Sequence, residues 1–149
     1  IGINFYESLV CALWLGRRLP IEKEWEKSAR GIDGRDYPWG EAMGYQNDYA
    51  NTCDFVIGRT SPVTEFEQGI SPFGCFDMAG NVWEWCAQLH LKGQITQRVA
   101  RGGSWLNYMV HSKCAYRNTF DPDERYPASG FRCVSLPLTE VDDDAEDDE

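Results

Sequence analysis

The chain has 149 residues, enough for one domain with a buried core. Six Trp, seven Tyr and seven Phe exclude a disordered, aromatic-poor chain, and 14 Gly with 7 Pro predict many turns. The last eight residues carry seven acidic groups, and removing those seven negative charges from the net charge of −10 leaves −3 for the rest. We therefore expect a mildly acidic domain over residues 1–138 and an acidic disordered tail over residues 139–149.

The sequence lacks the features typical of nucleic-acid or membrane binding. Its largest basic cluster is the pair Arg17 and Arg18, whereas nucleic-acid binders carry larger basic patches. No stretch approaches the roughly 20 apolar residues that a membrane span needs, and no signal peptide is visible. We expect neither nucleic acid nor a membrane as a partner.

Six cysteines are spread along the chain without a Cys-x-x-Cys pair, and there are only two His. This spacing disfavours a zinc site built from clustered thiolates. Two interpretations stay open: mostly buried free thiols in a reducing compartment, which favours a cytoplasmic location, or a disulfide framework. We favour the free thiols, which are Cys11, Cys53, Cys75, Cys86, Cys114 and Cys133.

The first element expected is a helix in "NFYESLVCALWLG". It begins at Asn4, which is followed three residues later by Glu, as in a capping box. Phe5, Leu9 and Leu13 repeat at four-residue spacing and predict an apolar stripe that ends near Gly16.

A second helix is expected in "RLPIEKEWEKSARG". Pro20 suits its first turn, and two glutamates lie close to the positive end of the helix. Ile21, Trp25 and Ala29 are predicted to share the inner face, and Gly31 supplies the stop.

The remainder is rich in Gly and Pro. Residues 31–44 predict an ordered loop held by Tyr37 and Trp39. The short strand candidates are "CDFVI" (53–57), "NVWEWCAQ" (81–88), "RVARGGSW" (98–105) and "GFRCVSL" (130–136). Together they predict an α+β domain with little regular secondary structure: two short helices, short antiparallel strands and long ordered loops.

Five blocks carry a family resemblance. In order and approximate spacing, the chain resembles the formylglycine-generating enzyme (sulfatase-modifying factor) family in "GRRLPIEKEWEKSARGIDGRDYPWG", "FGCFDMAGNVWEWC", "RGGSW", "CAYRN" and "GFRC". The resemblance spans Asn4 to Leu136. It implies a C-type-lectin-like fold, and it implies that the family's N-terminal part is not within this chain.

A calcium site is expected in "DMAGNVWEW". Asp77 and Glu84 offer carboxylate oxygens, and Gly80 lets the chain turn between them. With the carbonyls of Gly80 and Val82, these residues suit calcium, and the resemblance implies a calcium site at the same four positions. The alternative is that Asp77 and Glu84 only hydrogen-bond the loop.

Active relatives in this family use two cysteines that bind copper(I), for which soft thiolates are suited. The resemblance implies positions three and eight residues after Ser104, which are Asn107 and Ser112 here. Counting five and ten residues back from Cys114 gives Met109 and Ser104 instead. Neither count supplies a thiol pair, so we expect no copper and no oxidase activity.

The arginines of the blocks "RGGSW", "CAYRN" and "GFRC", which we call the frame, have a structural interpretation. Arg101, Arg117 and Arg132 are predicted to pair with core carboxylates such as Glu84, with substrate clamping as the secondary alternative. Ser104 has no His at a recognisable partner position, so we predict no nucleophilic triad and no catalytic residue.

Two function hypotheses remain. The first is a non-catalytic module that binds a protein or small ligand through the loops 106–113 and 119–129, whose aromatic residues suit interfaces. The blocks "RGGSW", "CAYRN" and "GFR" are also similar to the frame of the variable ligand-binding proteins of diversity-generating retroelements. The second is an enzyme of the formylglycine-generating or sulfoxide synthase type, completed by an N-terminal part or a partner chain. The candidate ligand-binding residues are Asn107, Tyr108, Met109, His111, Phe120 and Tyr126.

Overall fold

The computed structural model describes residues 1–41, 48–92 and 95–135. The predicted tail, 139–149, lies outside them, as do residues 42–44 of the predicted loop. Regular secondary structure is sparse, and the elements in chain order are α1 (Phe5–Trp14), β1 (Arg17–Arg18), α2 (Glu22–Arg30), η1 (Cys53–Phe55), η2 (Glu67–Gly69), β2 (Trp83–Lys92), β3 (Ile95–Arg101), η3 (Met109–Ser112), β4 (Arg117–Phe120), β5 (Ser129–Gly130) and β6 (Val134–Ser135). None of the helices in the described ranges has the length and apolar character needed to cross a bilayer.

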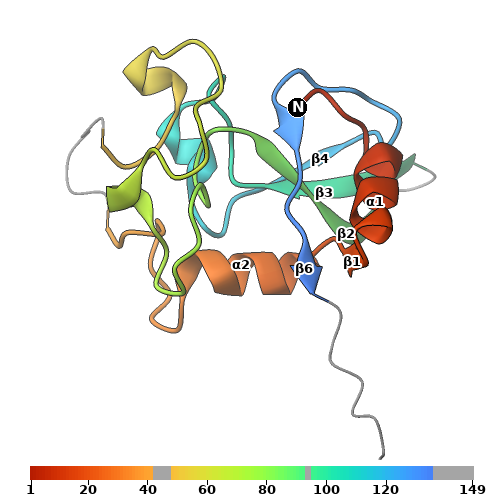
Figure 1. Ribbon diagram of the computed structural model, residues 1–149, viewed down its shortest axis with the longest axis horizontal. Coiled ribbons are helices and arrows are strands. Elements are labelled where there is room, and N and C mark those ends of the chain that lie inside the picture. Colours follow the sequence, from red (N-terminus) through yellow and green to blue (C-terminus); the bar gives the residue numbers. More distant parts are fainter. Residues whose placement is uncertain (42–47, 93–94, 136–149) are drawn as a thin grey trace, which may run out of the picture.

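A four-stranded sheet in the order β4-β3-β2-β5 forms the centre, and β1 pairs with β6 in a second, two-stranded sheet. Figure 1 shows α1 at one end of the central sheet, α2 along its side, and the long loops at the end away from α1. The expectation of antiparallel strands is wrong for one pair, because β5 runs parallel to β2. A parallel pair needs a long connection, and residues 93–128 supply it here.

Helix α1 begins as predicted. The side chain of Asn4 accepts a hydrogen bond from the Glu7 backbone N–H (2.9 Å), and the Glu7 carboxylate accepts one from the Asn4 N–H (2.9 Å). The predicted stripe is wrong in part, because Phe5 is buried but Leu13 is exposed. The buried face of the helix consists of Phe5, Ser8 and Ala12, and the Phe5 ring packs edge-on against Trp85 of β2.

Helix α2 places its predicted inner face correctly at two of three positions. Trp25 and Ala29 are buried, whereas Ile21 is the N-cap residue and is exposed. These two side chains join a core cluster with Met78, Cys86, Val99 and Cys114. A second cluster around Trp83 and Trp85 packs against α1.

The strand predictions succeed where the sheet is central. β2 and β3 overlap the predicted segments 81–88 and 98–105, but β2 runs on to Lys92 and β3 begins earlier, at Ile95. β3 stops at Arg101 because Gly102 and Gly103 have positive φ. The prediction for 53–57 is wrong: these residues form the short helix η1, which ends at Val56 in the left-handed region. The segment 130–136 is split between β5 and β6.

All six cysteines are free thiols in the structure. Cys86 and Cys114 are buried, Cys11 is exposed, and the other three are half-buried. Burial raises the pKa of Cys114 to about 12 and also raises the pKa of Cys86. At neutral pH the two core thiols are therefore protonated and poor nucleophiles.

Candidate ligand-binding site

The loop after β3 is built on two glycines and a buried serine. A Cβ on Gly103 would lie 2.3 Å from the Ser112 Oγ, so only glycine lets the two sides of the loop close together. Ser104 is fully buried, and its hydroxyl donates to the Asn107 Oδ1 at 2.6 Å. The Gly-Gly-Ser segment therefore sets the backbone path of the loop.

Asn107 forms hydrogen bonds to residues of the protein interior. Its Oδ1 also accepts from the Trp83 Nε1 at 2.8 Å, and its carbonyl accepts from the Cys53 N–H at 3.0 Å. Both oxygens of this predicted ligand-binding residue are engaged within the protein.

Asp54 holds the next turn. Its Oδ2 accepts from the Met109 N–H at 2.7 Å and from the Thr52 hydroxyl at 3.1 Å. Met109 itself is buried, at 6% exposure, so this predicted ligand-binding side chain points away from solvent. Sequence reasoning did not assign Asp54 this role, although it is the sole acidic residue of the segment 51–62.

The part of the loop that faces solvent is apolar and aromatic. Tyr108 is its most exposed large side chain, at 63%, and the ring of His111 packs edge-on against Tyr116 with centroids 5.1 Å apart. Tyr116 was missed because it lies outside both predicted loops. We call these residues the η3 surface: Leu106, Tyr108, Val110, His111 and Tyr116.

Phe120 and Tyr126 pack against the core tryptophans rather than against the η3 surface itself. Their rings stack at 5.2 Å, and Phe120 packs edge-on against Trp83 and Trp85. Trp83 also contacts Tyr116 at 6.2 Å, so one row of rings joins the loops 106–113 and 119–129. Both predicted residues are half-buried, and they reach the η3 surface only through Trp83.

The positions counted for copper ligands hold no thiol. Ser104 and Met109 are buried and bonded as described, and the buried Ser112 Oγ has no hydrogen-bond partner among the described residues. Cys53, whose backbone N–H donates to the Asn107 carbonyl, has a thiol whose pKa is raised by burial and by the charge of Asp54. A neutral thiol is a poor copper ligand.

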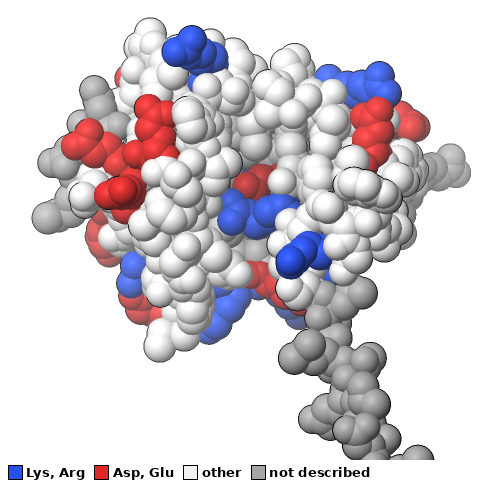
Figure 2. Space-filling model, in the orientation of Figure 1, with Lys and Arg blue, Asp and Glu red and all other residues white. Residues whose placement is uncertain are grey.

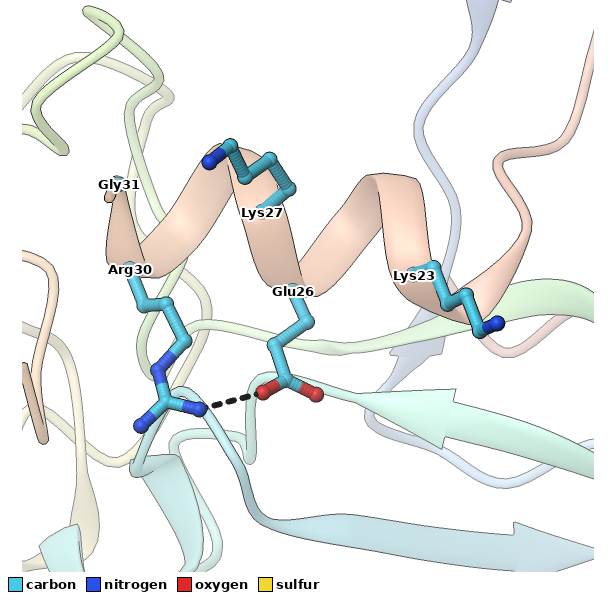
Figure 3. A pocket seen from close by; sticks show the side chains of 5 residues that line it. All are labelled: Lys23, Glu26, Lys27, Arg30 and Gly31. Atoms are coloured by element: carbon cyan, nitrogen blue, oxygen red, sulfur yellow. Dashed lines mark hydrogen bonds and ion pairs between the residues drawn. The ribbon is translucent and has the colours of Figure 1, made fainter. Parts of the chain in front are cut away.

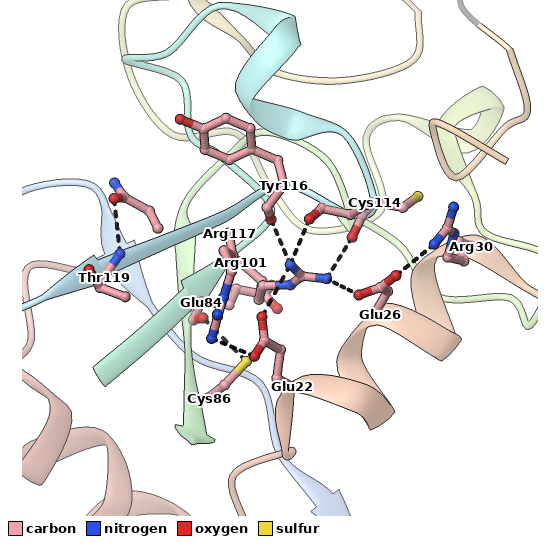
Figure 4. Close-up of polar contacts among 12 residues, drawn as sticks. Glu22, Glu26, Arg30, Glu84, Cys86, Arg101, Cys114, Tyr116, Arg117 and Thr119 are labelled. Carbon is pink, nitrogen blue, oxygen red and sulfur yellow. Dashed lines mark hydrogen bonds and ion pairs between the residues drawn. The ribbon is translucent and has the colours of Figure 1, made fainter. Parts of the chain in front are cut away.

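Arg101 ties the end of this loop to α2, as Figure 4 shows. Its guanidinium, 1% exposed, donates to the carbonyls of Cys114 (2.8 Å), Ala115 (3.0 Å) and Tyr116 (2.9 Å). It also pairs with Glu22 and Glu26 of α2, and Arg117 pairs with Glu22. The predicted pairing of these arginines with carboxylates is confirmed, with acidic partners on α2.

The predicted calcium ligands lie around Arg132. Both Glu84 oxygens are bonded: Oε1 accepts from Arg132 at 2.7 Å, and Oε2 accepts from the Trp25 Nε1 at 2.6 Å and from Arg132. The Asp77 Oδ2 is buried and accepts no hydrogen bond within the described part of the chain. Burial and the charge of Glu84 raise the pKa of Asp77, which is the electrostatic condition that a bound cation relieves.

These residues border a cavity of about 310 Å³, whose walls include Val63, Phe76 and Phe131. Among the residues that the structure describes, no three His, Cys, Asp or Glu side chains converge on a point that could hold a metal. A calcium ion would therefore depend on Asp77, a shared Glu84 and backbone carbonyls such as those of Gly80 and Val82. That donor set is hard and oxygen-only, which fits calcium.

A second hollow, of about 290 Å³, lies on α2 and is drawn in Figure 3. Its lining combines Lys23 and Lys27 with the ion pair of Arg30 and Glu26, 2.7 Å apart. A single half-exposed ion pair and two lysines along one helix face are typical of a solvated surface.

The model of the Sulfatase-modifying factor enzyme 1-like domain matches residues 1–136. The chain belongs to this family. Among curated members, it is 31% identical to the inactive Cα-formylglycine-generating enzyme 2 of Bos taurus, over 91% of this chain and 49% of that protein. It is also 31% identical to the formylglycine-generating enzyme of Thermomonospora curvata, over 93% and 55%.

A third similar protein is the serine/threonine-protein kinase pkn1 of Chlamydia caviae, 33% identical over 90% of this chain and 23% of the kinase. The chain thus spans from a quarter to about half the length of these relatives. Among solved structures of this fold, PvdO of Pseudomonas aeruginosa has a TM-score of 0.76 at 25% identity, covering 88% of this chain and 59% of PvdO. Variable protein 1 of Treponema denticola has a TM-score of 0.66 at 28% identity, covering 77% and 46%.

Proposed function

We propose that this chain is a non-catalytic binding module that holds a protein or small ligand on the η3 surface. The main support for the proposal is the set of side chains in the loop between Ser104 and Cys114. The positions counted for copper ligands carry amide, hydroxyl and thioether groups, while Tyr108 and its neighbours face solvent.

The chemistry of the surface favours a partner with apolar groups. Leu106, Tyr108 and Val110 are exposed without a charged side chain between them, and Tyr116 adds an aromatic ring beside His111. Rigid aromatic side chains bury much area at a small cost in conformational entropy. The Tyr116 ring packs on the core residue Trp83, which in turn packs on Phe120.

The comparisons with known proteins also favour a binding module. An inactive relative and a variable protein both use this fold, and in pkn1 the matched region is less than a quarter of the protein.

Similarity to an active formylglycine-generating enzyme favours a second candidate, an oxidase completed by a further segment or a partner chain. We expect the chain alone to produce no formylglycine from a sulfatase-type Cys peptide supplied with copper(I) and oxygen. Mass spectrometry of the peptide measures the outcome, with an active family enzyme as the positive control. Formation of the aldehyde would refute the binding-module proposal.

The ligand surface is tested with an immobilised library of peptides and glycans. For any compound bound by the protein, Tyr108→Ala should raise Kd by about 30-fold, the loss of a central aromatic contact. Phe73→Ala, a similarly exposed aromatic outside the η3 surface, is the matched control and should leave Kd unchanged. Equal Kd values for both variants would place the binding site elsewhere.

We also propose that calcium binds beside Asp77 and stabilises this end of the fold. At a calcium concentration of about 100 times Kd, the free energy of unfolding should rise by about 2.7 kcal/mol. Asp77→Gly removes the carboxylate and accepts the φ of 52° found there, so it should abolish the response. Thermal unfolding of both proteins with calcium and with a chelator is the measurement, and an unchanged Tm in the parent protein would reject the site.

A further inference from the structure

Two of the six thiols lie far apart in the sequence but on neighbouring elements of the fold. Cys11 belongs to the second half of α1, and Cys133 directly precedes β6. The short strand β1 connects the two places, because it follows α1 closely in the chain and pairs antiparallel with β6, with Arg18 opposite Val134. Figure 1 shows β1 and β6 side by side next to α1. The fold therefore brings the first helix and the last described strand together.

The packing of Cys133 places its thiol near α1. Cys133 is half-buried and packs against the core cluster that contains Ala12, the chain neighbour of Cys11. The two sulfur atoms are close enough for their charges to interact, since a thiolate at Cys11 raises the pKa of Cys133. β6 is two residues long and pairs with the equally short β1, so this end of the chain can adjust to the geometry that a disulfide requires.

Solvent access distinguishes these two thiols from those of the core. Cys86 and Cys114 are fully buried, and half-buried Cys75 packs against the cluster that contains both. An oxidant in solution reaches a fully buried thiol only when the core opens. Cys11 is exposed, and Cys133 is half-buried beside it. These two thiols therefore combine access to an oxidant with proximity to one another.

The charges around this end of the fold favour a thiolate and an anionic oxidant. Exposed Arg17 lowers the pKa of Cys133, which opposes the effect of burial, and its guanidinium donates to the Ser135 hydroxyl at 2.9 Å. Figure 2 shows basic groups on the surface around the end of β6. A positive surface attracts glutathione disulfide, which carries more carboxylates than amines.

We infer that Cys11 and Cys133 form a thiol–disulfide switch, which a low-molecular-weight disulfide oxidises and which then links α1 covalently to the segment leading into β6. In the reduced protein, the β1–β6 pairing holds this end of the chain. The link would enclose almost the whole described chain in one loop and so restrict the unfolded state. The inference concerns residues outside the η3 surface and does not depend on the proposed binding function.

Two successive exchanges form the link. The Cys11 thiolate attacks one sulfur of glutathione disulfide, which leaves a mixed disulfide on Cys11 and releases one glutathione thiolate. The Cys133 thiolate then attacks the Cys11 sulfur and releases the second glutathione thiolate. The two cysteines lose two protons and two electrons, and the two released glutathione molecules take them up.

Peptide mapping tests the pairing. The 149-residue chain is incubated with excess glutathione disulfide, its remaining thiols are blocked with iodoacetamide, and it is digested with trypsin. Cleavage after Arg17 and Arg132 places the two cysteines in separate peptides, residues 1–17 and 133–149. We expect mass spectrometry to find these two peptides joined, with the loss of two hydrogen atoms, and to find them separate after treatment with dithiothreitol.

Thermal unfolding tests the effect of the link. The oxidised protein should have a Tm about 10 °C higher than the reduced protein, because a disulfide that closes a long loop stabilises the folded state. Cys11→Ser should abolish both the joined peptides and the rise in Tm, and it should keep the fold because Cys11 is exposed. Cys53→Ser is the matched control, since Cys53 is half-buried like Cys133, and it should change neither result.

Three results would overturn the inference. Glutathione that stays on Cys11 without joined peptides would show that Cys133 is out of reach. A disulfide between other cysteines would show that the pairing is misassigned. Joined peptides with an unchanged Tm would show that the link does not constrain α1 and β6.

Discussion

Arg132→Ala should lower the free energy of unfolding by about 3–5 kcal/mol, the range found when one member of a buried ion pair is removed. Glu84 is 5% exposed, and Arg132 reaches both of its oxygens. The variant would leave that carboxylate with Trp25 as its remaining described side-chain partner. Urea denaturation followed by tryptophan fluorescence measures the loss.

The matched control is Arg125→Ala. Arg125 also pairs with a glutamate, Glu7, but both side chains are substantially exposed, and exposed pairs contribute little. We expect a barely changed unfolding midpoint. Similar losses in the two variants would mean that solvent or another group stabilises Glu84, and that Arg132 does not organise the region around Asp77.

Gly80→Ala should lower the free energy of unfolding by a comparable amount, about 3 kcal/mol or more, or should prevent folding. Gly80 has a φ of 74°, and a Cβ there would lie 2.3 Å from the carbonyl oxygen of Asn51. That same oxygen accepts a hydrogen bond from the Asn81 N–H at 2.8 Å, so the backbone of Asn51 cannot retreat without losing it.

Gly58→Ala measures the free-energy cost of the left-handed backbone conformation without a steric clash. Gly58 has nearly the same φ, 72°, but nothing lies within 4 Å of the position where its Cβ would be. The cost should be about 1–2 kcal/mol, that of the left-handed conformation alone. Equal losses at the two glycines would show that the contact between Gly80 and Asn51 relaxes, and that close approach is not what requires glycine.

Local chemistry made parts of this fold predictable. The capping box of Asn4 and Glu7 depends on residues three apart, and the sequence shows it directly. Trp25 and Ala29 were assigned to the core because α2 has one apolar stripe among charges. In both cases one structural solution satisfies the local pattern.

The predictions failed where distant contacts decide. α1 is apolar on several sides, so periodicity did not reveal that the small residues Ser8 and Ala12 would face the sheet. The segment 53–57 has strand composition, but Asp54 instead reaches across to the backbone of Met109, 55 positions away.

The candidate site was predictable in position and less so in orientation. Tyr108 faces solvent as expected, but Met109 does not, and Phe120 packs on two core tryptophans. Alternation along a loop has no fixed period, so the direction of each side chain follows from hydrogen bonds such as those of Asn107 and Asp54.

The hydrogen bonds of the Arg101 guanidinium determine which substitutions the loop of residues 102–116 tolerates. Arg101 stands at the start of the loop, and its side chain donates hydrogen bonds to three backbone carbonyls at the loop's far end, 13 to 15 residues later. Every amino acid has a backbone carbonyl, so these three hydrogen bonds close the loop whatever side chains its exposed positions carry. Substitutions at Leu106, Tyr108 or Val110 should therefore leave the closed loop and the fold beneath it intact.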